Sequence, residues 1–256
     1  MTIYGESDYK AKMQEAMHNM YNGGETRKER VMSKATMEMC HMPAQFYQCN
    51  EGHPRPLITS TLTLDTWLAN KMEPELPETV TALQGYLASI RKVHEQGFGL
   101  VLQGPNGTGK TMVACTMAYE WMKLFPIPKD GGVNHAYFIA LAELRRWMDL
   151  RKSFNSDDKA EYHAIKYDLE HRGFLIVDDV VNLFKPDEFM EREIFVRLLK
   201  TRAEANLINV VIMNMQLPEF VLAFGKTLSD ILQAKGKILK VEGRIRQYAP
   251  PAPWET

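Results

Sequence analysis

The 256 residues carry a formal net charge of -1, and 45% of them are hydrophobic and 25% charged, as in ordinary globular proteins. A charge so close to zero excludes a global attraction to nucleic acid or to a membrane surface, so contact with DNA would need a local basic patch. With three cysteines, no signal-like N-terminus and no apolar run long enough to span a bilayer, we expect a cytoplasmic protein without a membrane partner.

The N-terminal part of the chain predicts a helical appendage. Apolar side chains within residues 9–21 recur every three or four positions, which predicts an amphipathic helix that ends at Gly23-Gly24. Such a helix folds back on the core or docks in a groove of a partner, and the sequence leaves both open. The Pro-rich stretch 53–56 marks a boundary. We therefore predict a partner-docking segment over 1–56 and a core domain over 57–256.

Cys40, His41, Cys49 and His53 are residue types that bind zinc, but their spacing does not fit a zinc site. A structural site needs a pair of cysteines separated by two to four residues, and this segment has none. We predict no metal ligands here.

A complete phosphate-binding loop lies between a predicted strand over 98–103 and a predicted helix from Met112. Its glycines let the backbone N–H groups turn toward a polyphosphate, and the helix start adds a partial positive charge. We expect Met112 and every loop residue to bind ATP, with Lys110 reaching the β- and γ-phosphates and the Thr111 hydroxyl holding Mg²⁺. The loop consists of Gly104, Pro105, Asn106, Gly107, Thr108, Gly109, Lys110 and Thr111.

The segments before and after this loop carry further predictions. A helix is expected over 78–94 because its apolar residues follow a helical period. Trp67, upstream of the loop, lies either near the nucleotide base or in the core, and the sequence leaves both open. After the loop, a strand over 135–140 is followed by a basic helix over 141–154 and a polar helix that ends near His171.

A second chemical pattern combines an apolar strand with two acids. Residues 173–177 predict a buried strand that delivers Asp178 and Asp179 to its carboxyl end. After a phosphate-binding loop, Asp178 is expected to hold Mg²⁺ and Asp179 to orient the attacking water. A fourth strand is expected over 209–214 with the polar Asn214 at its end, and a fifth over 237–242.

Five strands alternating with helices predict a parallel α/β sheet. The motifs GPNGTGKT (104–111), AYFIALAEL (136–144), FLIVDDV (174–180) and VIMN (211–214) resemble those of the AAA+ ATPases of the DnaC/IstB group, over roughly residues 60–247. This group comprises bacterial and phage loaders of the replicative helicase and the ATPase subunits of one transposon class.

The resemblance implies a P-loop NTPase with a three-layer sandwich, in which the fourth strand of a five-stranded parallel sheet lies between the first and the third. Asn214 would then lie between the two acids and the loop and act on the γ-phosphate or the attacking water. Residues 243–256 are too few for the helical C-terminal lid of ordinary AAA+ proteins, and this group is similarly truncated.

The chain departs from the group where an arginine finger is expected. Thr227 and Ile231 occupy the arginine positions, with Lys226, Arg244 and Arg246 as other candidate cations. Since such an arginine contributes about 10³–10⁵ in rate in well-studied NTPases, we expect an ATPase that is slow without its partner. A milder departure is an aspartate, Asp179, where many AAA+ proteins have glutamate.

The resemblance implies a helicase loader that binds the hexameric replicative helicase and single-stranded DNA and self-associates on ATP binding. The basic helices fit such a role because phosphate contacts give sequence-tolerant binding, although acidic residues interleave with the basic ones. Two alternatives remain: an IstB-type transposition ATPase on duplex DNA, and an ATP-binding scaffold with little hydrolysis. The basic residues in question are Arg145, Arg146, Arg151, Lys152, Arg192, Arg197 and Lys200.

Overall fold

The computed structural model describes residues 63–69, 71–125, 135–180 and 189–244. The predicted helical appendage over 1–56, its boundary at 53–56 and the Cys40–His53 segment lie outside these described residues. The same holds for the tail after Arg244, and with it for the predicted absence of a lid.

A five-stranded parallel sheet forms the centre of the molecule, with the order β2-β3-β4-β1-β5. β4 pairs with both β1 and β3, so the prediction that the fourth strand lies between the first and the third is confirmed. Every residue of β1 and β4 is buried, as expected for inner strands covered on both faces. The strands are β1 (Gly99–Gln103), β2 (Ala136–Ala140), β3 (Phe174–Val180), β4 (Ile208–Met213) and β5 (Gly236–Lys240).

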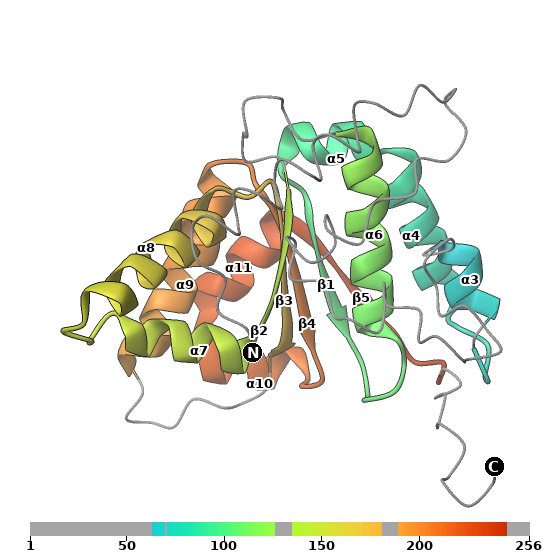
Figure 1. The fold of residues 1–256 in the computed structure, drawn as a ribbon. Coiled ribbons are helices and arrows are strands. Elements are labelled where there is room, and N and C mark those ends of the chain that lie inside the picture. The colour runs from blue at the N-terminus through green and yellow to red at the C-terminus, as the bar shows by residue number, and fades with distance from the viewer. Residues whose placement is uncertain (1–62, 70, 126–134, 181–188, 245–256) are drawn as a thin grey trace, which may run out of the picture.

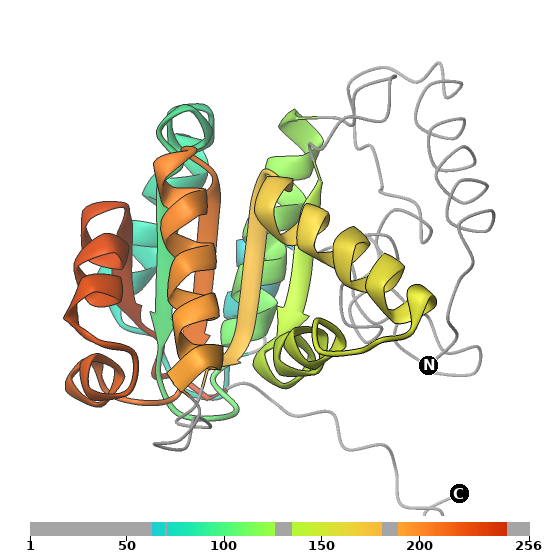
Figure 2. The same ribbon diagram turned by 90° about the vertical axis from the view of Figure 1, so that its left-hand side faces the viewer.

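Helices cover both faces of the sheet, which confirms the predicted three-layer sandwich (Figures 1 and 2). One face carries α3 (Leu64–Ala69), α4 (Pro77–Ala88), α5 (Ile90–Gln96) and α6 (Lys110–Leu124). The other carries α7 (Leu141–Leu150), α8 (Ser156–His171), α9 (Phe189–Glu204), α10 (Leu217–Phe224) and α11 (Lys226–Ala234).

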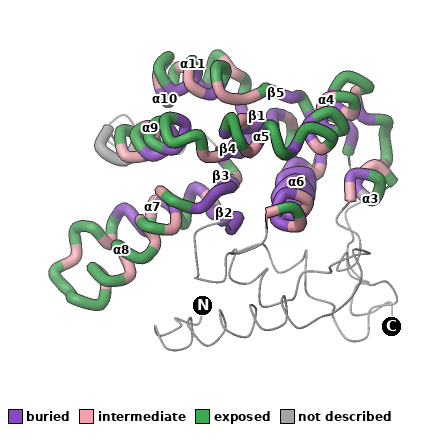
Figure 3. Tube along the Cα trace, turned by 90° about the horizontal axis from the view of Figure 1, so that it is seen from above, coloured by how far each residue is buried: buried purple, intermediate pink, exposed green. Residues whose placement is uncertain are grey.

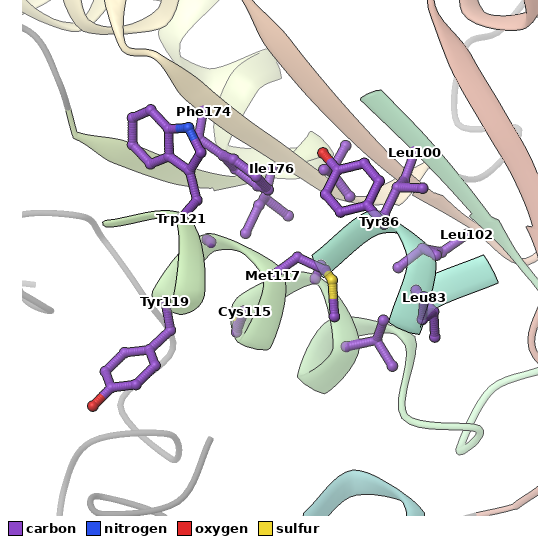
Figure 4. Close-up of a cluster of buried hydrophobic side chains, with 14 of the residues drawn as sticks. Leu83, Tyr86, Leu100, Leu102, Cys115, Met117, Tyr119, Trp121, Phe174 and Ile176 are labelled. Carbon is purple, nitrogen blue, oxygen red and sulfur yellow. The ribbon is translucent and has the colours of Figure 1, made fainter. Parts of the chain in front are cut away.

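The helix α6, which begins inside the phosphate-binding loop, is buried along almost its whole length (Figure 3). Its apolar side chains pack against the sheet, where Met117 and Trp121 belong to one buried cluster with Leu102 and Ile176 (Figure 4). Burial of this extent holds the start of α6 rigidly at the edge of the sheet. Trp67 is fully buried in the same cluster, so of the two alternatives for this residue the structure supports the core.

The structure corrects two predicted helices and adds a third helix that was not predicted. The predicted helix over 78–94 is interrupted at Ser89, where the backbone (φ -105°, ψ 17°) separates α4 from α5. The helix predicted over 141–154 ends at Leu150, because tight turns follow it and the Asn155 side chain caps α8 by accepting from the Asp157 amide. The segment before β5, for which no helix was predicted, forms α11.

Candidate nucleotide-binding site

The phosphate-binding loop joins the carboxyl end of β1 to the first turn of α6, at the lower edge of the sheet in Figure 1. Gly107 and Gly109 have φ angles of 78° and 82°, which side chains other than glycine rarely tolerate. Gly104 is required for a different reason, because a Cβ there would lie 2.0 Å from the carbonyl oxygen of Val241. Gly107 and Gly109 therefore allow the curvature of the loop, and Gly104 allows its close contact with the residue after β5.

Lys110 is folded back onto this loop. Its Nζ donates to the carbonyl oxygens of Gly104 (2.7 Å) and Pro105 (2.6 Å). Burial lowers the pKa of Lys110, and the nearby Asp178 and Asp179 act in the opposite direction. The ammonium is thus held at the mouth of the loop by neutral acceptors that an anion could replace.

The two acids lie on a β-bulge at the end of β3. The register of β3 against β4 shifts between Val177 and Val180, and Asp179 takes a left-handed conformation with φ 55°. The bulge leaves Asp178 half-buried and Asp179 exposed. The neighbouring amide of Asp179 donates to Asp178 Oδ1 at 2.7 Å. One strand end therefore presents two adjacent carboxylates in different environments.

Thr111 and Asp178 are joined directly, since Thr111 Oγ1 donates to Asp178 Oδ2 at 2.7 Å. Burial raises the pKa of Asp178, whereas the Thr111 hydroxyl and the Asp179 amide lower it. A hydroxyl and a carboxylate at hydrogen-bonding distance are hard oxygen donors of the kind that Mg²⁺ prefers alongside phosphate oxygens. The residues present therefore fit the predicted magnesium site.

Asn214 follows β4 and faces the loop from the neighbouring strand. Its Nδ2 lies 3.4 Å from Asn106 Oδ1 within the loop. The segment behind it is held by the buried Gln103, whose Nε2 donates to Met215 O and Gln216 Oε1, both at 3.0 Å. This clamp from β1 fixes the turn that carries the Asn214 amide.

The structure thus brings the loop, Asp178, Asp179 and Asn214 together at one edge of the sheet. Met112 differs from the other predicted binding residues, because its side chain belongs to the apolar core cluster. Only its backbone N–H, in the first turn of α6 where helical amides lack helical partners, is available to a phosphate.

Besides Gln103, sequence reasoning missed Lys71, which supports the loop, and its partner Glu75. Lys71 Nζ donates to Thr108 O at 2.8 Å, and Lys71 also forms a buried ion pair with Glu75. The only sequence signal for this pair is a Lys–Glu spacing of four, which is common on solvated helices and points to no site.

The positions where arginines were expected do not supply a cation. Thr227 is exposed on α11, while Ile231 is half-buried and lines a small cavity with Leu100 and Val101. Lys226 and Arg244 are exposed, and Arg246 lies outside the described residues.

The predicted basic helices are partly neutralised by their own carboxylates. Lys152 lies 3.4 Å from Asp149, and Lys200 lies 3.8 Å from Glu204. Between α7 and α8, Phe154 is 97% exposed. A basic helix therefore ends beside an aromatic ring that faces solvent.

Comparisons with known proteins support the fold. No protein-family model matches this sequence, and no curated protein matches it either. A crystal structure of the DnaC helicase loader matches with a TM-score of 0.52 at 15% identity, covering 69% of this chain and 98% of that one. The chain has the fold of DnaC. The predicted resemblance to DnaC-like P-loop proteins is thereby confirmed at the level of the fold.

A second match is a structure of the replication initiator DnaA bound to AMPPCP and single-stranded DNA. It has a TM-score of 0.51 at 14% identity and covers 71% of this chain and 50% of the DnaA chain. None of the helices in the described ranges combines the length and hydropathy needed to cross a membrane.

Proposed function

We propose that this chain binds and hydrolyses ATP with Mg²⁺ and acts as a helicase loader. The observation that carries the ATPase proposal is the convergence of the phosphate-binding loop, the two acids at the end of β3 and Asn214 at one edge of the sheet. Each comes from a different strand, and each supplies a group that phosphoryl transfer to water requires.

The chemistry follows from the residues in place. The curved loop and the first turn of α6 offer backbone N–H groups to the phosphates, and the Lys110 ammonium exchanges its loop carbonyls for phosphate oxygens. Thr111 and Asp178 hold Mg²⁺, which when bound offsets the negative charge of the phosphates. Asp179, exposed beside Asp178, accepts a hydrogen bond from the attacking water, and the Asn214 amide donates to the γ-phosphate or to that water.

Substitution of the loop lysine tests nucleotide binding. Lys110→Ala is expected to abolish the binding of ATP and Mg²⁺ measured by titration calorimetry. Lys123→Ala, at the other end of α6, is the matched control and should bind as the wild type does. Equal affinity in the Lys110 variant would refute the central assignment.

The loader proposal rests on the fold of DnaC and on surface chemistry. We propose that residues 1–56 dock on the hexameric replicative helicase and that the core contacts single-stranded DNA and self-associates when ATP binds. The exposed Arg146 on α7, the exposed Arg151 and Lys152 just after it and the neighbouring Phe154 support DNA contact, since cations bind the backbone and an aromatic ring stacks on bases.

One experiment separates the loader from its alternatives. ATPase activity is measured for the chain alone, with single-stranded DNA and with a replicative helicase, together with co-purification of that helicase. A loader is expected to co-purify with the helicase and to be stimulated by its partners. Filaments on long duplex DNA without helicase binding would instead indicate an IstB-type transposition ATPase.

A second candidate function is an ATP-dependent scaffold that hydrolyses little. It is favoured by Thr227 and Ile231, because neither position offers the cation that an arginine finger would bring to a neighbouring site. Retained ATP binding without turnover under all three conditions would identify the scaffold.

A further inference from the structure

Lys71, just after α3, forms a buried junction between three parts of the chain. Its ammonium donates to Glu75 Oε2 (2.5 Å), to the Thr108 carbonyl of the phosphate-binding loop (2.8 Å) and to the Gly243 carbonyl after β5. The same ammonium lies 4.3 Å from the centre of the Trp67 ring. All three N–H donors of the lysine are therefore used, each by a different segment.

Glu75 completes this junction. Its side chain is fully buried and that of Lys71 is only 5% exposed, so the two charges compensate each other away from water. The second carboxylate oxygen of Glu75 accepts from the amides of Leu76 and Glu242, both at 3.0 Å. The ion pair thus ties the segment after α3 to the end of β5 as well as to the loop.

The contact with Thr108 affects the direction of the next backbone amide of the phosphate-binding loop, that of Gly109. In a planar trans peptide the carbonyl and the following N–H point in opposite directions. When Lys71 holds the Thr108 carbonyl, it turns the N–H of Gly109 to the other side of the loop. Gly109, with φ 82°, has no side chain to fix this orientation by packing.

A merely stabilising role does not require this arrangement. A buried ion pair contributes little to stability compared with a well-packed apolar pair of the same volume. Here the lysine donates to a carbonyl of the phosphate-binding loop itself, which an apolar residue could not do.

We propose that Lys71 is a positioning residue that holds the Thr108–Gly109 peptide in its phosphate-binding orientation and thereby couples the docking of residues 64–76 to nucleotide binding. This inference rests on the proposed ATP binding. Because coupling is reciprocal, a nucleotide that holds the loop also holds the segment that Lys71 anchors.

The test compares two double variants in their affinity for ATP and Mg²⁺. Lys71→Met/Glu75→Gln removes both charges together and leaves an amide oxygen as acceptor in place of the carboxylate. Lys123→Met/Glu120→Gln is the matched control: it also removes an ion pair (2.9 Å) whose ammonium lies over an aromatic ring, Tyr119 (4.4 Å). We expect the Lys71 variant to bind ATP about ten- to a hundredfold more weakly, the loss typical of a hydrogen bond to a charged group, and the control to bind normally. Wild-type affinity in the folded Lys71 variant would overturn the inference.

Amide hydrogen exchange tests the same coupling on the wild-type chain, without a variant whose folding could be affected. ATP and Mg²⁺ are expected to slow amide hydrogen exchange within residues 64–76, because the occupied loop keeps the Lys71 junction closed. Unchanged exchange in this segment under saturating ATP would contradict the coupling. Failure of the proposed function is distinguishable, since the wild type would then bind ATP no better than Lys110→Ala.

Discussion

Asn214→Ala should separate catalysis from stability more clearly than any other change at the site. The Asn214 side chain is exposed, and its hydrogen bond to Asn106 Oδ1, at 3.4 Å, is at the long limit for such a bond. Exposed contacts of this kind change the free energy of unfolding by about 0.5 kcal/mol or less. In a domain of this size that corresponds to a shift in Tm of about 1–2 °C.

The expected effect on hydrolysis is much larger. If the Asn214 amide donates to the γ-phosphate or to the attacking water, its removal deletes one oriented donor at the reacting atoms, which costs about 10²–10³-fold in rate. ATP affinity should change little, since the loop and Lys110 remain. Single-turnover hydrolysis with excess protein measures the chemical step even when steady-state turnover is slow.

The control is Gln233→Ala, which removes an exposed amide from α11, where it is bonded to Ser229. It should leave Tm, ATP affinity and the single-turnover rate unchanged. Two results would refute the reasoning for Asn214: a single-turnover rate equal to that of the wild type, or a fall in rate that only follows a loss of folded protein.

Two predictions concern the scaffold behind the site. Arg202 is fully buried and donates three hydrogen bonds of 2.7–2.9 Å, one of them to Asn209, so Arg202→Met leaves buried acceptors unsatisfied and should lower the free energy of unfolding by about 3 kcal/mol. Urea denaturation measures this loss; ATP affinity per folded molecule should not change, and an unaltered urea midpoint would contradict the assigned role. Burial lowers the pKa of His135 to about 3, below its unfolded value of about 6.5, so between these two pH values His135 is neutral in the folded chain and protonated in the unfolded chain. The contribution of this residue to the free energy of unfolding should therefore be fully present above pH 6.5 and decrease as the pH falls, by about 2 kcal/mol at pH 5. The decrease in urea midpoint between pH 7 and pH 5 should be smaller in His135→Gln, and equal decreases would count against the assignment.

Much of the site could be predicted because its parts are contiguous in sequence. The eight residues of the phosphate-binding loop act through backbone shape, which their own glycines determine. An apolar strand ending in Asp178 and Asp179 likewise needs only the rule that the carboxyl ends of parallel strands meet at one edge of a sheet. The position of β4 beside β1 then brought Asn214 to the same edge, as the family resemblance implied.

The helix boundaries that sequence periodicity missed depend on single residues. The pattern over 78–94 is apolar at helical spacing on both sides of Ser89, so periodicity continues through a residue where the backbone leaves the helix. The capping role of Asn155 illustrates the same point, because its side-chain bond to the Asp157 amide sets the start of α8 whatever the apolar pattern before it.

The sequence by itself determined the strands, the phosphate-binding loop and the pair of acids, because each depends on neighbouring residues. Only the tertiary structure decided two other features: the bulge that leaves Asp178 half-buried and Asp179 exposed, and the junction at Lys71. The Lys71 ammonium contacts one carbonyl 37 residues away and another 172 residues away. No local pattern encodes such a contact, since it exists only once β1 and β5 pair and bring the loop and the end of β5 to the same lysine.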